Sequence, residues 1–165
     1  PTKVSAGGGR YRYRDDQETP DIHAVSYDFA GDKTITWEGL SCNQPGAGGN
    51  GFGATFYGEK GSMTVGSADY LIKDHQGEIL EQSSGNKGDN EHIENLLEAI
   101  RQGKPLSLNA EIETGFKSTL LSHLGNIAYR TGHCLQCDEK GHIKDNVDAQ
   151  ALWKRIYEPG WEPQI

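Results

Sequence analysis

The sequence predicts an α+β fold, with an open and mostly antiparallel β-sheet and helices packed on one face. Segments with strand character fill residues 1–82 and helical periodicity dominates residues 83–158, whereas a βαβ fold would alternate the two. Glycine, aspartate and asparagine punctuate the first part, as in tight turns between successive antiparallel strands. Because 165 residues suit one hydrophobic core, we expect a single domain over residues 1–165, with a tail at 159–165.

The predicted strands are short and follow one another along the first part of the chain. They cover residues 2–5, 10–14, 23–29, 34–40, 54–57, 62–65, 70–73 and 79–81. In the stretch HAVSYDF, Val25, Tyr27 and Phe29 alternate with small or polar residues. This period of two is typical of a strand with one buried face.

Two long helices are predicted in the second part, and both are expected to lie across the sheet. The first has an apolar stripe, can be capped by Asp89 or Asn90, and ends at Gly103. The second begins after Asn109 and ends at Gly132. The two apolar stripes consist of Ile93, Leu96, Leu97 and Ile100, and of Ile112, Phe116, Leu120, Leu124 and Ile127. A third helix is predicted at 147–156.

The face of the sheet that the helices leave open is expected to be apolar. We expect it to include Tyr27 or Val25, Ile35 and Trp37, which is more apolar surface than a monomer usually leaves in water. The sequence therefore predicts a homo-oligomer that pairs through this face.

The stretch HCLQCDEKGH has three of the four ligands of a zinc knuckle. Cys134 and Cys137 have the required spacing, and His142 follows Gly141, but Val147 stands where a knuckle has its last cysteine. His133 is a poor substitute ligand because it is adjacent to Cys134, and neighbouring residues of an extended chain point to opposite faces. We expect no bound metal.

The stretch GAGGNG matches the dinucleotide fingerprint G-x-G-x-x-G at Gly46, Gly48 and Gly51, with Asp69 near the place of a ribose-binding acid. The fingerprint functions where a strand leads into the glycines and a helix opens after them. Here Pro45 precedes the glycines and a strand-like segment follows. The interpretation is therefore a loop between strands, and we assign no cofactor-binding residue.

No complete active site can be recognised from spacing, and no catalytic residue is assigned. His92 and His123 lie within predicted helices, where a half-exposed or hydrogen-bonded histidine is the ordinary explanation. The acidic cluster at 15–21 can supply acid or base chemistry, although a solvated turn between strands explains it equally well.

The strand and loop TITWEGLSCNQPGAGGNG are the best candidate for a binding site. An aromatic ring stacks on the C–H groups of a sugar while amides and hydroxyls pair with its hydroxyl groups. The candidate substrate-binding residues are Trp37, Glu38, Ser41 and Asn43. Ordinary packing of a sheet residue is the alternative for Trp37.

Charge and composition exclude several classes of partner. The net charge of −8 argues against binding to a phosphate backbone. No apolar run approaches the ~20 residues that span a bilayer. Three cysteines do not make a disulfide framework, so a reducing compartment is expected, cytoplasmic by default, with a periplasmic location as the alternative. The chain starts without methionine in a strand-like pattern, so we expect a piece of a longer protein.

Several stretches together resemble the C-terminal half of the glucose-fructose oxidoreductase and inositol dehydrogenase family (Gfo/Idh/MocA). They are, in order, PTKVSAGGGRY, ETPDIHAVSYDFAGDKTITWEG, FYGEKGSMTV, HIENLLEAIRQGKP, GFKSTLLSHLGNIAYRTGHCLQCD and YEPGW. Each is a modest signal, but their order and spacing are specific and extend over nearly the whole chain.

The resemblance implies an NAD(P)-dependent oxidoreductase acting on a sugar, a polyol or a related compound. In such proteins an N-terminal Rossmann domain carries NAD or NADP and the catalytic residues, so we expect neither on this chain. The C-terminal domain walls the substrate cleft and holds a homo-oligomer together. Two alternatives remain, a free-standing carbohydrate-binding module and a structural oligomerisation module without catalysis.

Overall fold

The computed structural model describes residues 1–42 and 52–164, and these residues belong to two compact units. The first unit comprises Pro1–Cys42 and Glu113–Ile165, and the second comprises Asn43–Ile112. Together they contain two antiparallel sheets, neither of which closes on itself, and three α-helices among the described residues. The predicted α+β class is confirmed, although the strands divide into two sheets rather than one. The single-domain organisation stays a prediction.

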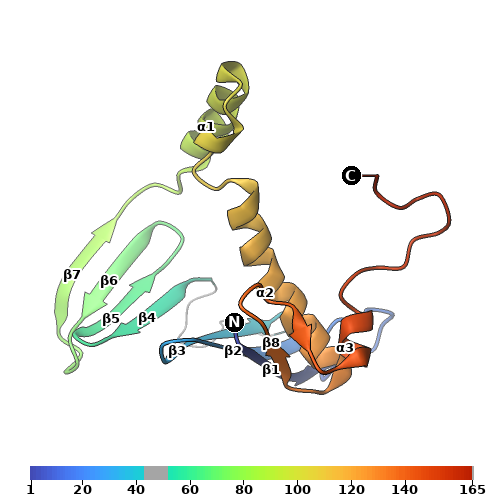
Figure 1. Ribbon diagram of the computed structural model, residues 1–165. Helices are drawn as coiled ribbons and strands as arrows, with labels where there is room; N and C mark the ends of the chain where they lie inside the picture. The colour runs from blue at the N-terminus through green and yellow to red at the C-terminus, as the bar shows by residue number, and fades with distance from the viewer. Residues whose placement is uncertain (43–51, 165) are drawn as a thin grey trace. The chain divides into compact units, whose positions relative to one another are not determined.

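The first unit contains a five-stranded antiparallel sheet in the order β3-β2-β1-β8-β9 (Figure 1). The strands are β1 (Lys3–Gly9), β2 (Ile22–Phe29), β3 (Lys33–Leu40), β8 (Leu135–Cys137) and β9 (Ile143–Lys144). The strand predicted at 10–14 is wrong. The backbone N–H groups of Tyr11, Arg12 and Tyr13 bond to the Asp21 carboxylate instead of to a neighbouring strand, so this segment is a loop.

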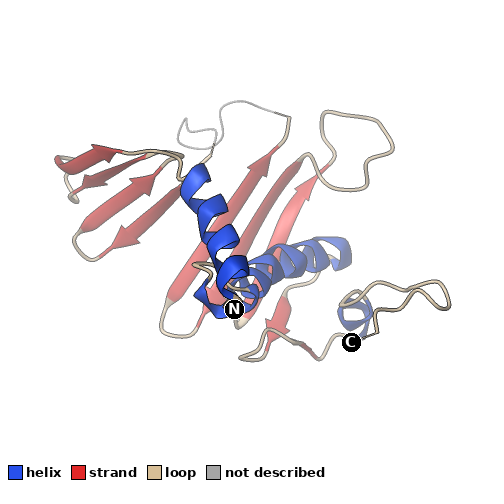
Figure 2. Ribbon diagram, turned by 90° about the horizontal axis from the view of Figure 1, so that it is seen from above, coloured by secondary structure: helices blue, strands red, loops and turns tan. Residues whose placement is uncertain are grey.

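The helix α2 (Ile112–Thr131) covers one face of this sheet with its second half (Figures 1 and 2). Leu124 and Ile127 are buried against strand residues, whereas Ile112 and Phe116, on the first half of the predicted stripe, are exposed. The hydroxyl of Tyr27 donates to the backbone carbonyl of Leu121 over 2.8 Å. Each fully buried aliphatic side chain contributes about 1.5–3 kcal/mol, so this helix and sheet form the main core of the unit.

The open face of the five-stranded sheet is polar, which corrects the sequence expectation. Val25 and Tyr27 are buried beneath α2. Their cross-strand partners Trp37 and Ile35 share that face, because residues directly opposite each other on neighbouring strands point to the same side. The other face carries Ser26, with Ser5 and Thr36 beside it. The alternation in β2 was predicted correctly, but the apolar side faces the helix rather than solvent.

The stretch HCLQCDEKGH is a β-hairpin formed by β8 and β9 and the turn between them. Cys137 is buried in the core while Cys134 is exposed. The carboxylate of Asp138 accepts hydrogen bonds over 2.8 Å from the backbone N–H groups of Lys140 and His142. The residues that resemble a knuckle are therefore used to close a turn and fill a core. These two short strands lie in the part of the chain predicted to be mainly helical.

The third helix, α3 (Val147–Ala151), is shorter than the predicted 147–156. The Asn146 side chain caps it by accepting from the backbone N–H of Ala149 over 2.9 Å. After Leu152 the chain leaves the helical path. There the Trp153 backbone carbonyl lies 2.8 Å from Nε2 of His123 on α2, so His123 has the structural role expected from its helical position.

The second unit contains a four-stranded meander and a helix. Its strands pair in sequence order and are β4 (Ala54–Gly58), β5 (Gly61–Val65), β6 (Asp69–Lys73) and β7 (Ile79–Ser84). The helix α1 (Asp89–Gln102) is followed by the short 3-10 turn η2 (Pro105–Ser107). Asn95 on α1 donates to the Ser107 carbonyl over 3.3 Å, which joins the helix to this turn.

Two details of α1 differ from the prediction. Its N-cap is Gly88 in a left-handed conformation, without a side-chain cap from Asp89 or Asn90. Its apolar stripe is exposed, with Ile93 and Ile100 55% and 66% accessible, instead of lying against a sheet. The predicted end at Gly103 is confirmed, because this residue has the positive φ of 62° of a helix C-cap. No described helix is long and apolar enough to cross a membrane.

Candidate functional site

Asp21 organises the end of the five-stranded sheet where the candidate residues lie. The side chain is 1% exposed. Its carboxylate accepts the backbone N–H of Tyr11 at 3.0 Å and that of Arg12 at 2.9 Å. These two bonds hold the pKa of Asp21 below its usual value, because they favour the charged form. Asp21 is therefore an ionised and buried anchor for the loop after β1.

The same anchor fixes Ser41 just beyond β3. The Ser41 hydroxyl donates to the backbone carbonyl of Asp21 over 3.0 Å, and its N–H donates to the same oxygen over 2.9 Å. Arg12 donates to the backbone carbonyl of Cys42. Ser41 therefore already uses its hydroxyl proton, and toward a ligand it can act only as an acceptor.

His23 lies at the centre of this region, on the helix side of β2. It is buried, with 8% of its surface exposed. Its ring centroid is 5.5 Å from that of Trp37 and 5.3 Å from that of Tyr129, and both contacts are edge-to-face. Burial lowers the pKa of His23, and a hydrogen bond to the backbone of Gly125 opposes that effect. Among the described residues nothing pairs with its buried Nε2 atom. The buried imidazole thus has an unused hydrogen-bonding position at Nε2.

The structure separates the four residues that the sequence grouped as a binding site. Trp37 is half exposed on the helix side of β3, whereas Glu38 points to the open face beside Ala24. Ser41 lies past the end of the strand, and Asn43 falls outside the described residues. The partner that the structure gives Trp37 is His23, which sequence reasoning missed. The available signal was the alternation of β2, which places His23 in one row with Val25 and Tyr27.

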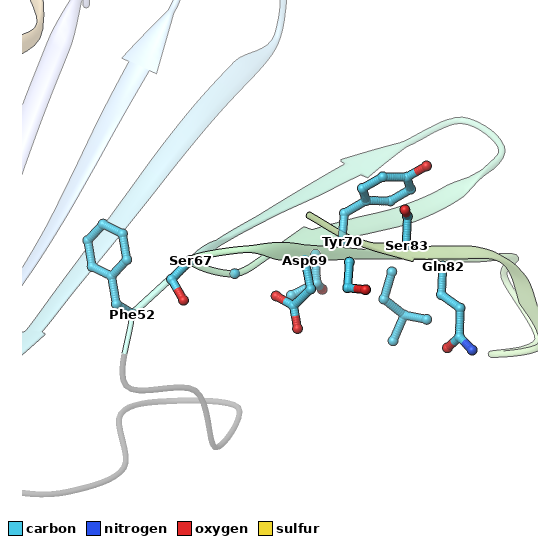
Figure 3. A pocket seen from close by; sticks show the side chains of 10 residues that line it. Phe52, Ser67, Asp69, Tyr70, Gln82 and Ser83 are labelled. Atoms are coloured by element: carbon cyan, nitrogen blue, oxygen red, sulfur yellow. The ribbon is translucent and has the colours of Figure 1, made fainter. Parts of the chain in front are cut away.

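A second candidate site is a groove in the four-stranded sheet, with a volume of about 840 Å³. Ser67, Asp69 and Gln82 point to one side of the sheet, while Tyr70 and Ser83 point to the other (Figure 3). No described residue donates a hydrogen bond to the Asp69 carboxylate, which leaves it available to a ligand with donor groups. This groove is rich in hydroxyl, amide and carboxylate groups, the chemistry that recognises polyhydroxylated ligands.

The Asp69 carboxylate is placed by the turn between β5 and β6. A Cβ atom at Gly66 would lie 2.1 Å from its Oδ1, so only glycine leaves room for the carboxylate in this position. The Gly66 N–H also donates to the Asp69 backbone carbonyl over 2.9 Å, which closes the turn. The sequence indicated Asp69 only as a possible ribose-binding residue of the glycine-rich motif. In the structure it lies where the turn between β5 and β6 ends.

The zinc-knuckle motif and the glycine-rich motif are the two places where the sequence resembles a metal or cofactor site. Within residues 1–42 and 52–164 there is no group of three histidine, cysteine or acidic side chains able to hold a metal ion. Burial raises the pKa of the Cys137 thiol, which disfavours the thiolate that zinc requires. The absence of a bound metal stays a prediction. The glycines of the GAGGNG motif fall outside the described residues.

Comparisons with known proteins bear on the fold. No protein-family model matches the sequence, and a search of curated proteins finds no significant match. A proposed oxidoreductase from Thermotoga maritima superimposes with a TM-score of 0.60 and 15% identity, over 82% of this chain and 40% of that chain. Proposed oxidoreductases from Bacillus subtilis and Klebsiella pneumoniae give TM-scores of 0.49 and 0.48 at 14% and 12% identity. They cover 84% and 92% of this chain and 45% and 46% of theirs.

This chain therefore spans less than half the length of these three solved structures. The likeness to the Thermotoga maritima protein shows a shared fold. The sequence resemblance predicts the fold of one part of an oxidoreductase, and the shared fold agrees with that prediction.

Proposed function

We propose that this chain is the C-terminal, substrate-side domain of an NAD(P)-dependent oxidoreductase that acts on a sugar, a polyol or a related compound. The observation that carries the proposal is the fold shared with part of the Thermotoga maritima protein. The sequence resemblance, which extends along nearly the whole chain, supports the same assignment. The reaction of the complete enzyme is hydride transfer between a substrate carbon and the nicotinamide.

The elements that flank the glycine-rich stretch argue against a nicotinamide site on this chain. A dinucleotide site needs a strand, a glycine turn and a helix whose N-terminus meets the pyrophosphate. The elements on either side of residues 43–51 are β3 and β4, both strands. We therefore assign NAD or NADP to an N-terminal Rossmann domain outside this chain, and derive no step through it here.

The share of function proposed for this chain is to bind substrate and to assemble the enzyme. The half-exposed Trp37 offers an apolar ring face for a sugar, and the fixed Ser41 hydroxyl offers an acceptor. We also propose a homo-oligomer through the open face of the five-stranded sheet. Small side chains such as Ser26 allow another flat surface to approach that face closely.

A free-standing carbohydrate-binding module is the second candidate, and the groove around Asp69 and Gln82 favours it. A structural oligomerisation module has no comparable feature. The two main candidates differ in what the neighbouring coding sequence contains. A continuous upstream reading frame with a strand, a G-x-G-x-x-G turn and a helix supports the oxidoreductase, and its absence supports the module.

The biochemical test compares this chain with the full-length protein. We expect calorimetric titrations of this chain with NAD and NADP to be flat, and the full-length protein to bind one of them and to oxidise a sugar or polyol. Micromolar binding to the isolated chain, abolished by Gly48→Ala or Gly51→Ala, would show that the glycine-rich loop holds the cofactor after all. A full-length protein inactive toward a panel of sugars and polyols with both cofactors would contradict the oxidoreductase assignment.

A further inference from the structure

The unpaired Nε2 atom of His23 is the least explained polar group in the described structure. Buried nitrogen and oxygen atoms nearly always have a hydrogen-bond partner, because an unpaired buried polar atom has lost its bonds to water. Asp21, two residues away, is also buried, and its carboxylate accepts the backbone N–H groups of Tyr11 and Arg12. The fold therefore satisfies one buried polar side chain at this end of the sheet and leaves the other with an open position.

The neutral ring of His23 can pair through Nε2. Burial lowers the pKa of His23, which favours the neutral imidazole. A neutral imidazole has an N–H group on one nitrogen and a lone pair on the other. A hydroxyl group both donates and accepts hydrogen bonds, so it can pair with the open Nε2 position.

The strands on either side of His23 carry glycine opposite it, and Trp37 lies beside its ring. The cross-strand neighbours of His23 are Gly8 on β1 and Gly39 on β3, neither of which has a side chain. A Cβ atom at Gly39 would lie 2.2 Å from the Trp37 ring, so the indole rests directly on the bare backbone. The Tyr129 ring on α2 also contacts His23 edge-to-face.

Trp37 can leave this position at low cost. Its side chain is 50% exposed and belongs to β3, an edge strand of the sheet. It is not part of the buried cluster beneath α2. A rotation about the side-chain torsions of Trp37 would move the indole away from the His23 ring without disturbing the buried cluster.

We propose that His23 and Trp37 form a covered binding site, in which Trp37 swings aside and a hydroxyl group of a neutral ligand forms a hydrogen bond with Nε2 of His23. The inference deepens the proposed function and rests on it for the substrate class, because sugars and polyols are neutral and carry hydroxyl groups, and sugars have ring faces that suit Trp37 and Tyr129. An anion is disfavoured because the neutral His23 ring carries no positive charge.

The test measures the reactivity of His23 in the intact 165-residue chain. Diethyl pyrocarbonate acylates unprotonated imidazole nitrogens, and mass spectrometry gives a rate for each histidine. Minor conformations of proteins are populated at about 0.1–10%, so His23 should react at about one-thousandth to one-tenth of the rate of His92, which is exposed on α1. Trp37→Ala should bring the two rates close together. The matched control is Ile35→Ala, at an equally exposed position on the same strand and face, which should leave the rate unchanged.

Ligand probes complete the test. Glucose and glycerol should slow the acylation of His23 in the Trp37→Ala variant in proportion to occupancy, and tetrahydropyran, a ring without hydroxyl groups, should not. Nitrogen-15 shifts of the His23 ring in the unaltered chain should report a neutral imidazole, and the Nε2 signal should move toward its hydrogen-bonded position when glucose is added. This measurement stands even where Trp37→Ala fails to fold.

Several outcomes overturn the inference. The first is that His23 reacts as fast as His92 in the unaltered chain. The second is that His23 stays unreactive in a folded Trp37→Ala variant. The third is that neither glucose nor glycerol protects His23 from acylation. These failures are distinct from failure of the proposed function. If the full-length protein oxidises sugars but His23 is not protected, only the inference fails. If His23 is protected but the full-length protein binds neither cofactor, only the oxidoreductase assignment fails.

Discussion

Asp21 and His23 show how two buried polar side chains at one end of a sheet can have different roles. Asp21 receives backbone N–H groups from the loop after β1 and so fixes the path of that loop. His23 contacts the rings of Trp37 and Tyr129, and its buried Nε2 atom has no partner among the described residues. The Asp21 carboxylate therefore has a structural role, whereas Nε2 of His23 remains available to a ligand.

Replacing Asp21 should release the loop at residues 10–20. We expect Asp21→Ala to lower the thermal midpoint clearly and Asp21→Asn to lower it less, because an amide oxygen can still accept some of the backbone N–H groups. Amide hydrogen exchange should accelerate at Tyr11 and Arg12 in the alanine variant. Asp15→Ala is the control, an exposed carboxylate in the same loop. Equal effects of the two alanine variants would refute the anchor.

The folded state disfavours protonation of Asp21, and this sets a pH dependence. Because its pKa is lowered from 3.8, its contribution to stability is complete above that value and is lost as the pH falls through the folded-state pKa. We expect acid unfolding of the unaltered chain to be steeper below pH 3.8 than that of Asp21→Asn. Urea titrations at a series of pH values measure this, and parallel curves would contradict it.

His23 should give the chain a second pH dependence at milder acidity. Since burial lowers its pKa from 6.5, the unfolded chain takes up a proton first as the pH falls. Stability is then constant above this pH and decreases below it, down to the folded-state pKa. His23→Phe should remove this decrease, whereas His92→Gln, on exposed α1, should not. Denaturant midpoints between pH 7.5 and 4.5 test it, roughly the range in which histidines titrate.

The helix α2 contains two glycines that permit a matched comparison. A Cβ atom at Gly125 would lie 2.7 Å from the Tyr27 hydroxyl and 3.2 Å from a methyl group of Val25. Gly125→Ala should therefore push the helix off β2 and cost about 1–3 kcal/mol of unfolding free energy. At Gly115 nothing lies within 4 Å, so Gly115→Ala should stabilise by about 0.5–1 kcal/mol through helix propensity alone. Equilibrium unfolding of both variants decides it, and the same sign for both would contradict the packing described for α2.

The β8–β9 hairpin should be held by packing rather than by metal. Cys137→Ser places an unpaired hydroxyl in the core and should cost about 1–3 kcal/mol, whereas exposed Cys134→Ser should change stability by less than about 0.5 kcal/mol. Chelation with EDTA should leave the thermal midpoint unchanged. About one zinc ion per chain by elemental analysis, lost together with stability in Cys137→Ser, would restore the knuckle interpretation.

The strands and helices differ in how far their sequence predicted them. The period of two in β2 and the turn chemistry between β4 and β7 placed those strands within one to three residues. The boundaries of α1 and α2 were also predicted closely, because caps and stripes are local signals. The segment at 10–14 failed because alternating tyrosine and arginine imitate a strand, while its hydrogen-bond partner, Asp21, is not recognisable from local pattern.

The open face of the five-stranded sheet is the proposed site of self-association. We expect this chain to form a homodimer that buries on the order of 2,000 Å² in total through the open face of the five-stranded sheet. Ser26→Arg would place a charge at the centre of that face and should give monomers. The control is Glu139→Arg, in the exposed turn after β8. Light scattering coupled to size exclusion measures the mass, and a monomer at micromolar concentration would contradict the expected assembly.

The sequence by itself determined what depends on neighbouring residues. It determined the α+β class, the alternation of β2, the end of α1 at Gly103 and the absence of a complete zinc ligand set around Cys134. Local periodicity encodes these features, because side-chain direction repeats every two residues in a strand and every 3.6 residues in a helix.

Only the tertiary structure decided what depends on pairing between distant segments. The Tyr27 hydroxyl bonds to Leu121, 94 positions away, and Val4 on β1 pairs with Leu135 on β8. Such contacts decide which face of β2 is buried. They place Trp37 beside His23 and Glu38 on the opposite face of the sheet. The physical reason is that a strand's own sequence fixes which residues share a face, whereas the elements that pack on that face decide which of the two is buried.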